Sequence, residues 1–326
     1  MGERTQAGAA ADAAPFVAFV TLVVAAGGNA PAIRYVSCES CELAPFWGAA
    51  MRFLAAAIIF AGITRARRVP MPRGRALVGG ALFGVLQFGA GFGLIYLGLV
   101  RAPAGLGQVL IACVPLLTFG LALAHRQERF TWDGLVGAVV AIGGIAVVFG
   151  SGLNTGVPLV SMLAILAGAA CWAEALVVVK AFPPVHPTAM NTIAMGVGGA
   201  FLLAVSAATG ETFTVPREAV TWGAQSYLVL AGSIGVFWLY VFVLRGWTAS
   251  AASYQLVLIP LVTVPVSAWL QNEPITWSFL VGSLLVLTGV YIGALRASRA
   301  ARARAAEQVG APEAPVALPD PDTRPR

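Results

Sequence analysis

Ten long apolar stretches run through the chain, and each of 18–24 residues is long enough to cross a hydrocarbon core of about 30 Å as an α-helix. They are residues 15–36, 44–64, 76–99, 104–124, 133–150, 158–180, 187–208, 221–243, 249–270 and 277–296. Backbone polar groups cannot stay unpaired in lipid, and the alternating pattern of a membrane β-barrel is absent. The sequence therefore predicts an all-α integral membrane protein with ten transmembrane helices.

Composition agrees with this prediction and leaves little room for a soluble domain. Hydrophobic residues make up 59% of the chain and charged residues 10%, against about 45–50% and 25% in soluble domains. The connections between spans are short. Residues 1–14 and 297–326 are rich in Ala, Pro and charge, and we predict that both are disordered. The first span lacks a small-residue cleavage site, so we expect it to be retained rather than removed as a signal peptide.

The positive charge lies where membrane topology requires it. With the N-terminus in the cytoplasm, the loop RARRVPMPRGR and the arginines after residue 295 fall on the cytoplasmic side, whereas Arg34, Arg101 and Arg217 fall outside. The positive-inside rule then predicts a multi-pass inner-membrane protein with both termini cytoplasmic. The net charge of +6 is explained by topology, so no nucleic-acid partner is expected. The basic loop is within reach of anionic lipid.

A repeated phrase divides the chain into two halves. ERFTWDGLVG, from Glu128, returns 145 positions later as EPITWSFLVG, from Glu273. At the same offset, and beyond the phrase that ends at Gly137 and Gly282, lie two further identical pairs, Pro115 with Pro260 and Gly144 with Gly289. Each half holds five spans, and because five is odd, equivalent helices must cross the membrane in opposite directions. Inverted repeats of this kind are typical of secondary transporters, which expose one site to each side in turn.

The repeated phrase itself has two interpretations. An acidic side chain just before a helix suits the positive end of the helix dipole, and Trp132 and Trp277 suit the membrane interface. Alternatively, Glu128 and Glu273 form a proton-coupling pair. The glycines of FGAGFG and GVGG predict close helix contacts.

The cysteines give weaker signals. Cys38 and Cys41, in SCESCE, could form a disulfide or hold a metal, but a lone CxxC is not specific for either. Cys113 and Cys171 lie inside spans, where we expect them to pack as small residues.

The two halves resemble the paired EamA repeats of the drug/metabolite transporter superfamily. The strings from APAGLGQVL and from WTASAASYQ each open a helix with small residues, continue through a mid-helix Pro to a Glu at the loop, and end in a Gly-spaced helix. GGNAPAIR resembles the family's opening Trp-Gly-x-Asn motif, with Ala26 in the place of Trp, and WAEALVVVK is similar to its second-half version. Arg52 matches an arginine of the family's second helix. The resemblance places one repeat at 15–150 and the other at 158–296, and implies a carrier, often an exporter of amino acids or other small polar metabolites driven by an ion gradient or by exchange.

Charges inside hydrocarbon are functional candidates by default. We predict that Arg52 attracts a substrate carboxylate and that Glu174 holds an amine or the coupling proton; a structural ion pair between them, or an Arg52 that reaches the outer surface, is the alternative. Pro31, Pro115 and Pro260 interrupt or kink helices and are gating candidates. The remaining candidates for substrate binding are polar or aromatic residues within the spans, for which hydrogen bonds between helices are the alternative role: Asn29, Gln87, Tyr96, Gln108, Trp172, Asn191, Trp238, Tyr254 and Gln255.

Other classes of protein are disfavoured. There are two histidines and no GxSxG or HExxH sequence, so an intramembrane enzyme is not expected; no Walker A sequence or channel filter is present. We expect a secondary-active exporter of a small molecule, without cofactor or metal. The protein itself lies in the lipid bilayer as a monomer or homodimer. A nucleotide-sugar or drug carrier of the same fold is the second possibility, and a scaffold or receptor the third.

Overall fold

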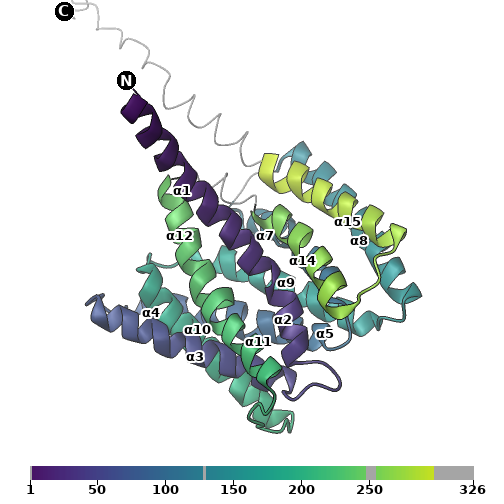
Figure 1. The fold of residues 1–326 in the computed structure, drawn as a ribbon, viewed down its shortest axis with the longest axis horizontal. Coiled ribbons are helices and arrows are strands. Elements are labelled where there is room, and N and C mark those ends of the chain that lie inside the picture. Colours follow the sequence, from purple (N-terminus) through teal and green to yellow (C-terminus); the bar gives the residue numbers. More distant parts are fainter. Residues whose placement is uncertain (1, 128–129, 247–254, 297–326) are drawn as a thin grey trace, which may run out of the picture.

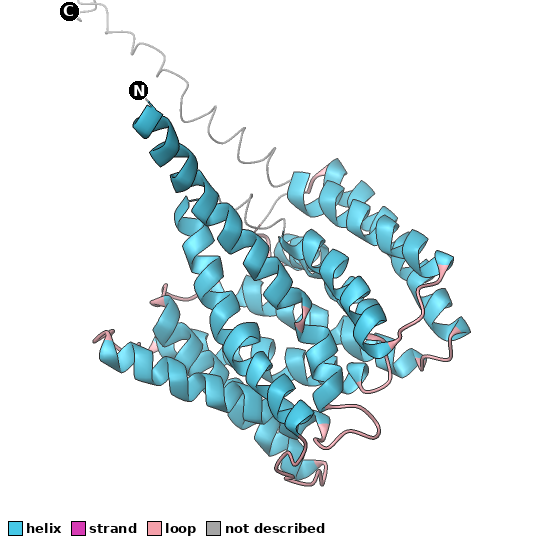
Figure 2. Ribbon diagram, viewed as in Figure 1, coloured by secondary structure: helices cyan, strands magenta, loops and turns pink. Residues whose placement is uncertain are grey.

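The computed structural model describes residues 2–127, 130–246 and 255–296, and in these ranges the chain is helical throughout, without strands (Figures 1 and 2). The first half contains α1 (Gly2–Gly27), α2 (Asn29–Val36), α3 (Pro45–Ala66), α4 (Arg75–Phe83), η1 (Gly84–Gly91), α5 (Phe92–Leu99), α6 (Ala104–Ile111), α7 (Val114–Ala124) and α8 (Trp132–Asn154). The second contains α9 (Leu159–Val179), α10 (Pro187–Ala208), α11 (Ala219–Val229), η2 (Leu230–Gly235), α12 (Val236–Gly246), α14 (Gln255–Gln271), α15 (Trp277–Val290) and η3 (Tyr291–Arg296).

The ten-helix prediction is confirmed. Eight helices of the described residues are long and apolar enough to cross a membrane, and two shorter apolar helices, Leu258–Gln271 and Trp277–Gly293, coincide with the ninth and tenth predicted spans. The N-terminus differs from the prediction: α1 begins at Gly2, so the helix includes residues that we expected to be disordered. This stretch, AGAAADAA, is rich in alanine, which has the highest helix propensity. The tail 297–326 lies outside the described residues.

The halves are inverted with respect to each other. α8 and α15 are equivalent under the 145-residue offset, and a Cβ on Gly137 would meet the Gly289 carbonyl at 2.5 Å, whereas one on Gly144 would meet the Gly282 carbonyl at 2.8 Å. Along this contact the residue numbers increase in α8 while they decrease in α15, so the two helices pack antiparallel. They lie side by side in Figure 1. Trp132 and Trp277, which begin these helices, therefore lie at opposite ends of the pair.

A second equivalent pair, α3 and α10, packs in the same way. Gly199 approaches Leu54, and at the other end of the pair the Thr64 and Thr192 hydroxyls are 3.2 Å apart. The glycine-rich stretches serve this packing, as predicted: a Cβ on Gly198 would meet the Gly84 carbonyl at 2.7 Å, and one on Gly89 would meet the Phe201 ring at 2.8 Å. Small residues thus set the distance between helices.

The repeated Thr-Trp of the phrase begins a helix in each half. Thr131 accepts a hydrogen bond from the Gly134 amide, and Thr276 accepts one from the Phe279 amide, both at 3.2 Å. Threonine at the N-cap satisfies an amide that the helix itself cannot. The phrase therefore recurs because each half needs a capped start for its fifth helix.

Two faces of the bundle are used below. The disulfide face carries the loop 37–44, in which Cys38 and Cys41 form a disulfide. The basic face carries the loop 67–74, at the other end of α3. Of the two roles left open for these cysteines, the structure has the disulfide.

Candidate functional site

Arg52 is the most deeply buried charge of the described residues, with 1% of its surface exposed. It lies two turns into α3 from the disulfide face and is bound by neutral oxygens. Its Nε donates to Ser233 Oγ at 3.0 Å, and its Nη2 donates to the Gly232 carbonyl at 3.2 Å and to Asn29 Oδ1 at 3.4 Å. Its Nη1 lies 3.5 Å from the Tyr96 hydroxyl. Four helices thus converge on one guanidinium.

No carboxylate neutralises Arg52 among the described residues: the ion pairs found there involve other arginines and a histidine. Two aromatic rings compensate in part, because the guanidinium carbon lies 5.0 Å from the Phe53 centroid and 5.1 Å from that of Phe92. Neutral oxygens and ring faces solvate a cation less well than an anion does. The site is therefore complementary to a negatively charged group.

The π-helical segment η2 supplies two of these oxygens. A π-helix shifts its hydrogen bonds by one residue and redirects local carbonyls, and such segments are frequent at functional sites. The Gly232 carbonyl accepts from both Arg52 and the Asn29 amide, and the Ser233 hydroxyl accepts from Arg52 while it donates to the Leu228 carbonyl at 2.9 Å. The backbone of η2 therefore forms one wall of the site.

Another part of the site comes from the interruption between α1 and α2 at Gly28. Pro31 has no N–H, so it cannot bond to the carbonyl of Gly27. The Thr263 hydroxyl of α14 donates to that carbonyl instead, at 2.8 Å. Asn29, which binds Arg52, follows the interruption directly. The interruption thus joins the first span to both Arg52 and α14.

A second π-helical segment, η1, occupies the equivalent place in the first half. Its Gln87 carbonyl accepts from the Trp172 indole at 2.9 Å, and the Gln87 Oε1 is buried without a hydrogen-bond partner. Trp172 also packs against Phe92, with ring centroids 4.6 Å apart. Phe92 also contacts Arg52, which is bound to η2. A chain of contacts through Trp172, Phe92 and Arg52 therefore links η1 to η2.

Glu174 lies elsewhere, near the basic-face end of α9. Its Oε1 is 3.0 Å from His125 Nε2, while its Oε2 is buried without a partner. The alternative of a structural ion pair between Arg52 and Glu174 is wrong. The two side chains have different partners, because Arg52 contacts Asn29, Tyr96 and η2 whereas Glu174 contacts His125.

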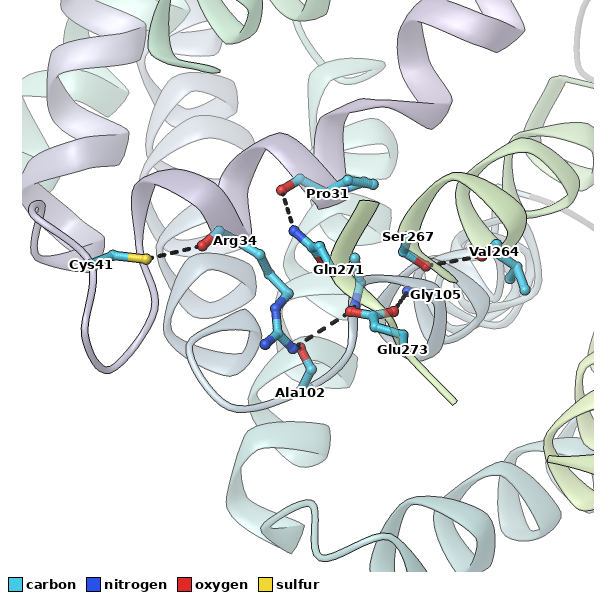
Figure 3. A network of polar contacts seen from close by, with 10 residues as sticks. Pro31, Arg34, Cys41, Ala102, Gly105, Val264, Ser267, Gln271 and Glu273 are labelled. Carbon is cyan, nitrogen blue, oxygen red and sulfur yellow. Dashed lines mark hydrogen bonds and ion pairs between the residues drawn. The ribbon is translucent and has the colours of Figure 1, made fainter. Parts of the chain in front are cut away.

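A polar network joins the halves at the disulfide face (Figure 3). Glu273 accepts from the Ala104 and Gly105 amides, at 2.7 and 3.2 Å, and lies 3.6 Å from Arg34. Gln271 donates to the Pro31 carbonyl at 2.9 Å. We name Arg34, Gln271 and Glu273 with these backbone partners the disulfide-face network. Cys41 Sγ lies 3.2 Å from the Arg34 carbonyl; as a disulfide sulfur it has no proton to donate, so this is a contact only.

Comparison with known protein families identifies the one to which this fold belongs. The model of the EamA-like transporter family matches residues 14–150 and 159–294, the two halves found above. The chain belongs to the EamA-like transporter family.

Similar proteins with transporter names agree with this assignment. The uncharacterized inner membrane transporter YedA of Escherichia coli K12 is 28% identical over 71% of this chain and 76% of its own length. A probable terminal-alkyne amino-acid exporter of Streptantibioticus cattleyicolor is 31% identical over 69% and 75%. A solved crystal structure with 17% identity superposes with a TM-score of 0.61 over 88% of this chain and 99% of its own, which shows the fold alone. The chain is therefore an inner-membrane transporter, as predicted.

Within this EamA-like fold, the predicted site residues fall into two groups. The structure brings together Asn29, Arg52 and Tyr96, and places Gln87 and Trp172 beside them. The remaining candidates in the described part of the chain make no hydrogen bond or ring contact with Arg52. Asn191 donates to the Pro187 carbonyl of its own helix at 2.9 Å, and Trp238 packs under the Arg67 guanidinium at 4.5 Å. Gln255 begins α14, and Tyr254 lies outside the described residues.

The two equivalent prolines that we named as gating candidates differ between the repeats. The fourth span is broken at Ala112 and Cys113, so Pro115 lies in the first turn of α7, where its missing N–H costs nothing. Gln108 is buried on α6, one turn before this break. Pro260 lies inside a continuous α14. The two equivalent prolines therefore have different local structures.

Sequence reasoning missed several partners of Arg52. Gly232, Ser233 and Phe92 were not among the predicted site residues, and a serine within GSIG is the one signal that could have indicated them. The role of Glu273 also needs correction: it binds the N-terminus of α6, not that of α15, the helix that follows it. Glu128 lies outside the described residues.

Proposed function

We propose that this transporter is a secondary-active exporter of amino acids or other small metabolites that carry a carboxylate, and that Arg52 binds the carboxylate. The observation that carries the proposal is the buried guanidinium held by neutral oxygens and two aromatic rings. On insertion scales, a charged side chain at the centre of the bilayer costs about 3 kcal/mol of free energy. A bound anion offsets that cost, so it is preferred over neutral compounds.

Alternating access follows from the pseudo-symmetric halves. To open the site toward the disulfide face, the carrier must break contacts of the disulfide-face network, because Glu273 and Gln271 belong to one half and their partners to the other. When a carboxylate occupies Arg52, it competes with the Gly232 carbonyl for Nη2. Release of that carbonyl lets η2 regain α-helical hydrogen bonds, which couples binding to a change in the eighth span.

Export from the cytoplasm is the direction we propose. The basic face carries Arg65, Arg67 and Arg68, so the positive-inside rule assigns it to the cytoplasm, together with both termini. The disulfide on the opposite face supports this orientation, because disulfides persist in oxidising compartments. Glu174, paired with His125 on the cytoplasmic side, is the candidate for proton coupling; exchange is the other possible driving force.

The name of one relative, an amino-acid exporter, supports this substrate class over the second candidate, a nucleotide-sugar or drug carrier. The test is reconstitution of the pure protein in proteoliposomes. Radiolabelled amino acids and other carboxylates are compared with purines and sugars, with and without a proton gradient. Saturable counterflow of carboxylates alone is the expected result, and counterflow of sugars or purines alone would support the second candidate.

Arg52→Gln should abolish that transport. Loss of a buried charge that pairs with a ligand costs about 2–5 kcal/mol, about 30-fold or more in transport efficiency. The variant removes a buried charge without a counter-ion but also loses the hydrogen bonds to Ser233, Gly232 and Asn29, so its melting temperature is measured to show that it is folded. Arg101→Gln is the control, since Arg101 is exposed and pairs with Glu39 on the surface. Wild-type carboxylate transport by a folded Arg52→Gln protein would rule out the assignment.

A further inference from the structure

A hollow of about 480 Å³ lies on the basic face, where α3 ends beside the first turns of α10. Its lining includes Thr64 and Arg65 from the end of α3, Arg68 and Met71 from the loop 67–74, and Thr192 from α10. Arg65 is thirteen residues beyond Arg52 on the same helix, which is about 20 Å along the helix axis. The hollow is therefore separate from the site described above.

The two arginines of the hollow have no anionic partner among the described residues. Arg65 and Arg68 are exposed, and no carboxylate lies within ion-pair distance of either in the described part of the chain. The arginines of the disulfide face differ, since Arg34 pairs with Glu273 and Arg101 with Glu39. Arg67, between the two, contacts Trp238 instead. Two guanidinium groups thus remain available to one ligand.

The backbone at Arg68 is a second observation at this hollow, because a left-handed turn places an arginine there in a conformation that glycine adopts more easily. Arg68 has φ of +54°, the left-handed conformation in which helices commonly end on glycine. The Arg68 amide bonds to the Arg65 carbonyl, and the Val69 amide bonds to the Thr64 carbonyl at 3.0 Å. Glycine would adopt this turn without strain, so the turn alone does not explain the arginine. Residues in such conformations cluster at functional sites.

The floor of the hollow fixes which groups can bind. Thr192 donates its hydroxyl hydrogen to the Thr188 carbonyl at 2.9 Å, so Thr64 is the donor in the pair with Thr192. Neither hydroxyl has a hydrogen left for a ligand. The arginines must therefore bind an anion alone, and the forked guanidinium suits phosphate oxygens. Ala61, Val69 and Met71 add an apolar edge.

We infer that this hollow binds the headgroup of an anionic phospholipid from the cytoplasmic leaflet, with Arg65 and Arg68 on the phosphate and the apolar edge against the glycerol and first methylenes. The position favours a lipid over a free phosphate, since Thr64 belongs to a membrane span and the hollow lies where that span ends. Basic pockets between spans on the cytoplasmic side recognise lipid headgroups. The leaflet follows from the orientation proposed above, but the lipid assignment does not depend on the substrate.

The experiment measures lipid binding by native mass spectrometry of the full chain, with phosphatidylglycerol and phosphatidylcholine at 0.15 M salt. We expect one phosphatidylglycerol to bind preferentially, and Arg65→Gln/Arg68→Gln to weaken it by about fivefold for each arginine. Arg73→Gln/Arg75→Gln is the matched control, with the same change of charge on the basic face but outside the residues that line the hollow. Its effect should stay below about twofold, because salt screens exposed charges that do not touch the ligand.

Each other result overturns the inference. Equal losses in the two double variants would mean a general attraction to the basic face. Equal binding of phosphatidylcholine would mean no headgroup selection. Displacement of the lipid by millimolar glycerol phosphate would identify a soluble phosphate as the ligand. If the first double variant does not fold, Arg68→Gly replaces it, since glycine keeps the left-handed turn and removes one guanidinium.

Discussion

The two halves of this transporter differ most clearly at their π-helical segments, η1 in the first half and η2 in the second. η1 and η2 lie at equivalent positions of the inverted repeat, but η2 contacts the guanidinium of Arg52 whereas η1 contacts the indole of Trp172. At the 145-residue offset, the counterpart of Arg52 is Val197. The backbone is thus nearly symmetric while the chemistry is not. A symmetric scaffold provides two states of similar energy, and in the proposed function the single charge of Arg52 is what fixes the place of the ligand.

The first prediction asks whether the η1 side carries the proton. Glu174 follows Trp172 by two residues on α9, and Gln at this position cannot bind a proton reversibly. Glu174→Gln should abolish proton-driven accumulation in proteoliposomes but leave exchange between equal substrate pools. His125→Gln is the companion variant, because it removes the partner at 3.0 Å and keeps the carboxylate. Full accumulation with an unchanged pH profile in Glu174→Gln would exclude this residue from coupling.

The second prediction concerns the backbone of η2. A Cβ on Gly232 would lie 1.9 Å from Asn29 Oδ1 and 3.3 Å from Arg52 Nη2, so Gly232→Ala must displace Asn29 from the site. Overpacking of this kind costs about 1–3 kcal/mol. We expect a lower melting temperature and weaker carboxylate counterflow.

The control for Gly232→Ala is Gly223→Ala on α11. A Cβ there meets no atom within 4 Å, and alanine favours helix by about 1 kcal/mol over glycine. This variant should keep transport and melt no lower than wild type. If both variants transport alike, contact between η2 and Asn29 has no part in binding.

The third prediction tests the η1 contact, and its effect should be smaller. Trp172→Phe removes the indole N–H that bonds to the Gln87 carbonyl but keeps an aromatic ring beside Phe92. Hydrogen bonds between membrane helices average about 0.6 kcal/mol, with a maximum near 1.7. The affinity of Trp172→Phe for a carboxylate should therefore stay close to that of the wild type, whereas Arg52→Gln should lose this affinity. An equal loss in both variants would mean that the two segments serve one site jointly.

Much of the fold could be predicted because its signals are local. Apolar length predicts the spans, and a repeat of an odd number of spans predicts inversion. Arg52 could be singled out because a charge within a span is costly. Its partners could not, since LAGSIG and GVLQFGAG carry no pattern that distinguishes a π-helix from an α-helix. The same holds for Glu273, whose partners at Ala104 and Gly105 are fixed only by packing of the two halves.

The smallest effect is expected at Glu42, on the loop before α3. Its carboxylate accepts from the Arg217 amide at 2.9 Å and from the Glu218 amide at 3.1 Å, just before α11, the helix that leads into η2. The hydrogen bond from the Thr221 side chain, followed by these backbone hydrogen bonds and the Arg217 charge, lowers the pKa of Glu42 below its ordinary 4.5. A carboxyl with a lowered pKa stabilises the fold above that ordinary value, and the contribution is lost as pH falls through the lowered pKa.

Glu42→Gln should therefore melt slightly below wild type at pH 7, and the difference should vanish as the pH falls below 4.5. Melting curves of both proteins in detergent from pH 7 to pH 3 measure it. Glu39→Gln is the control, because Glu39 lies on the same loop but pairs with exposed Arg101 rather than with backbone amides. A difference that is constant across this range would mean that the charge of Glu42 does not hold α11, and η2 would then be positioned by Arg52 and its helix contacts alone.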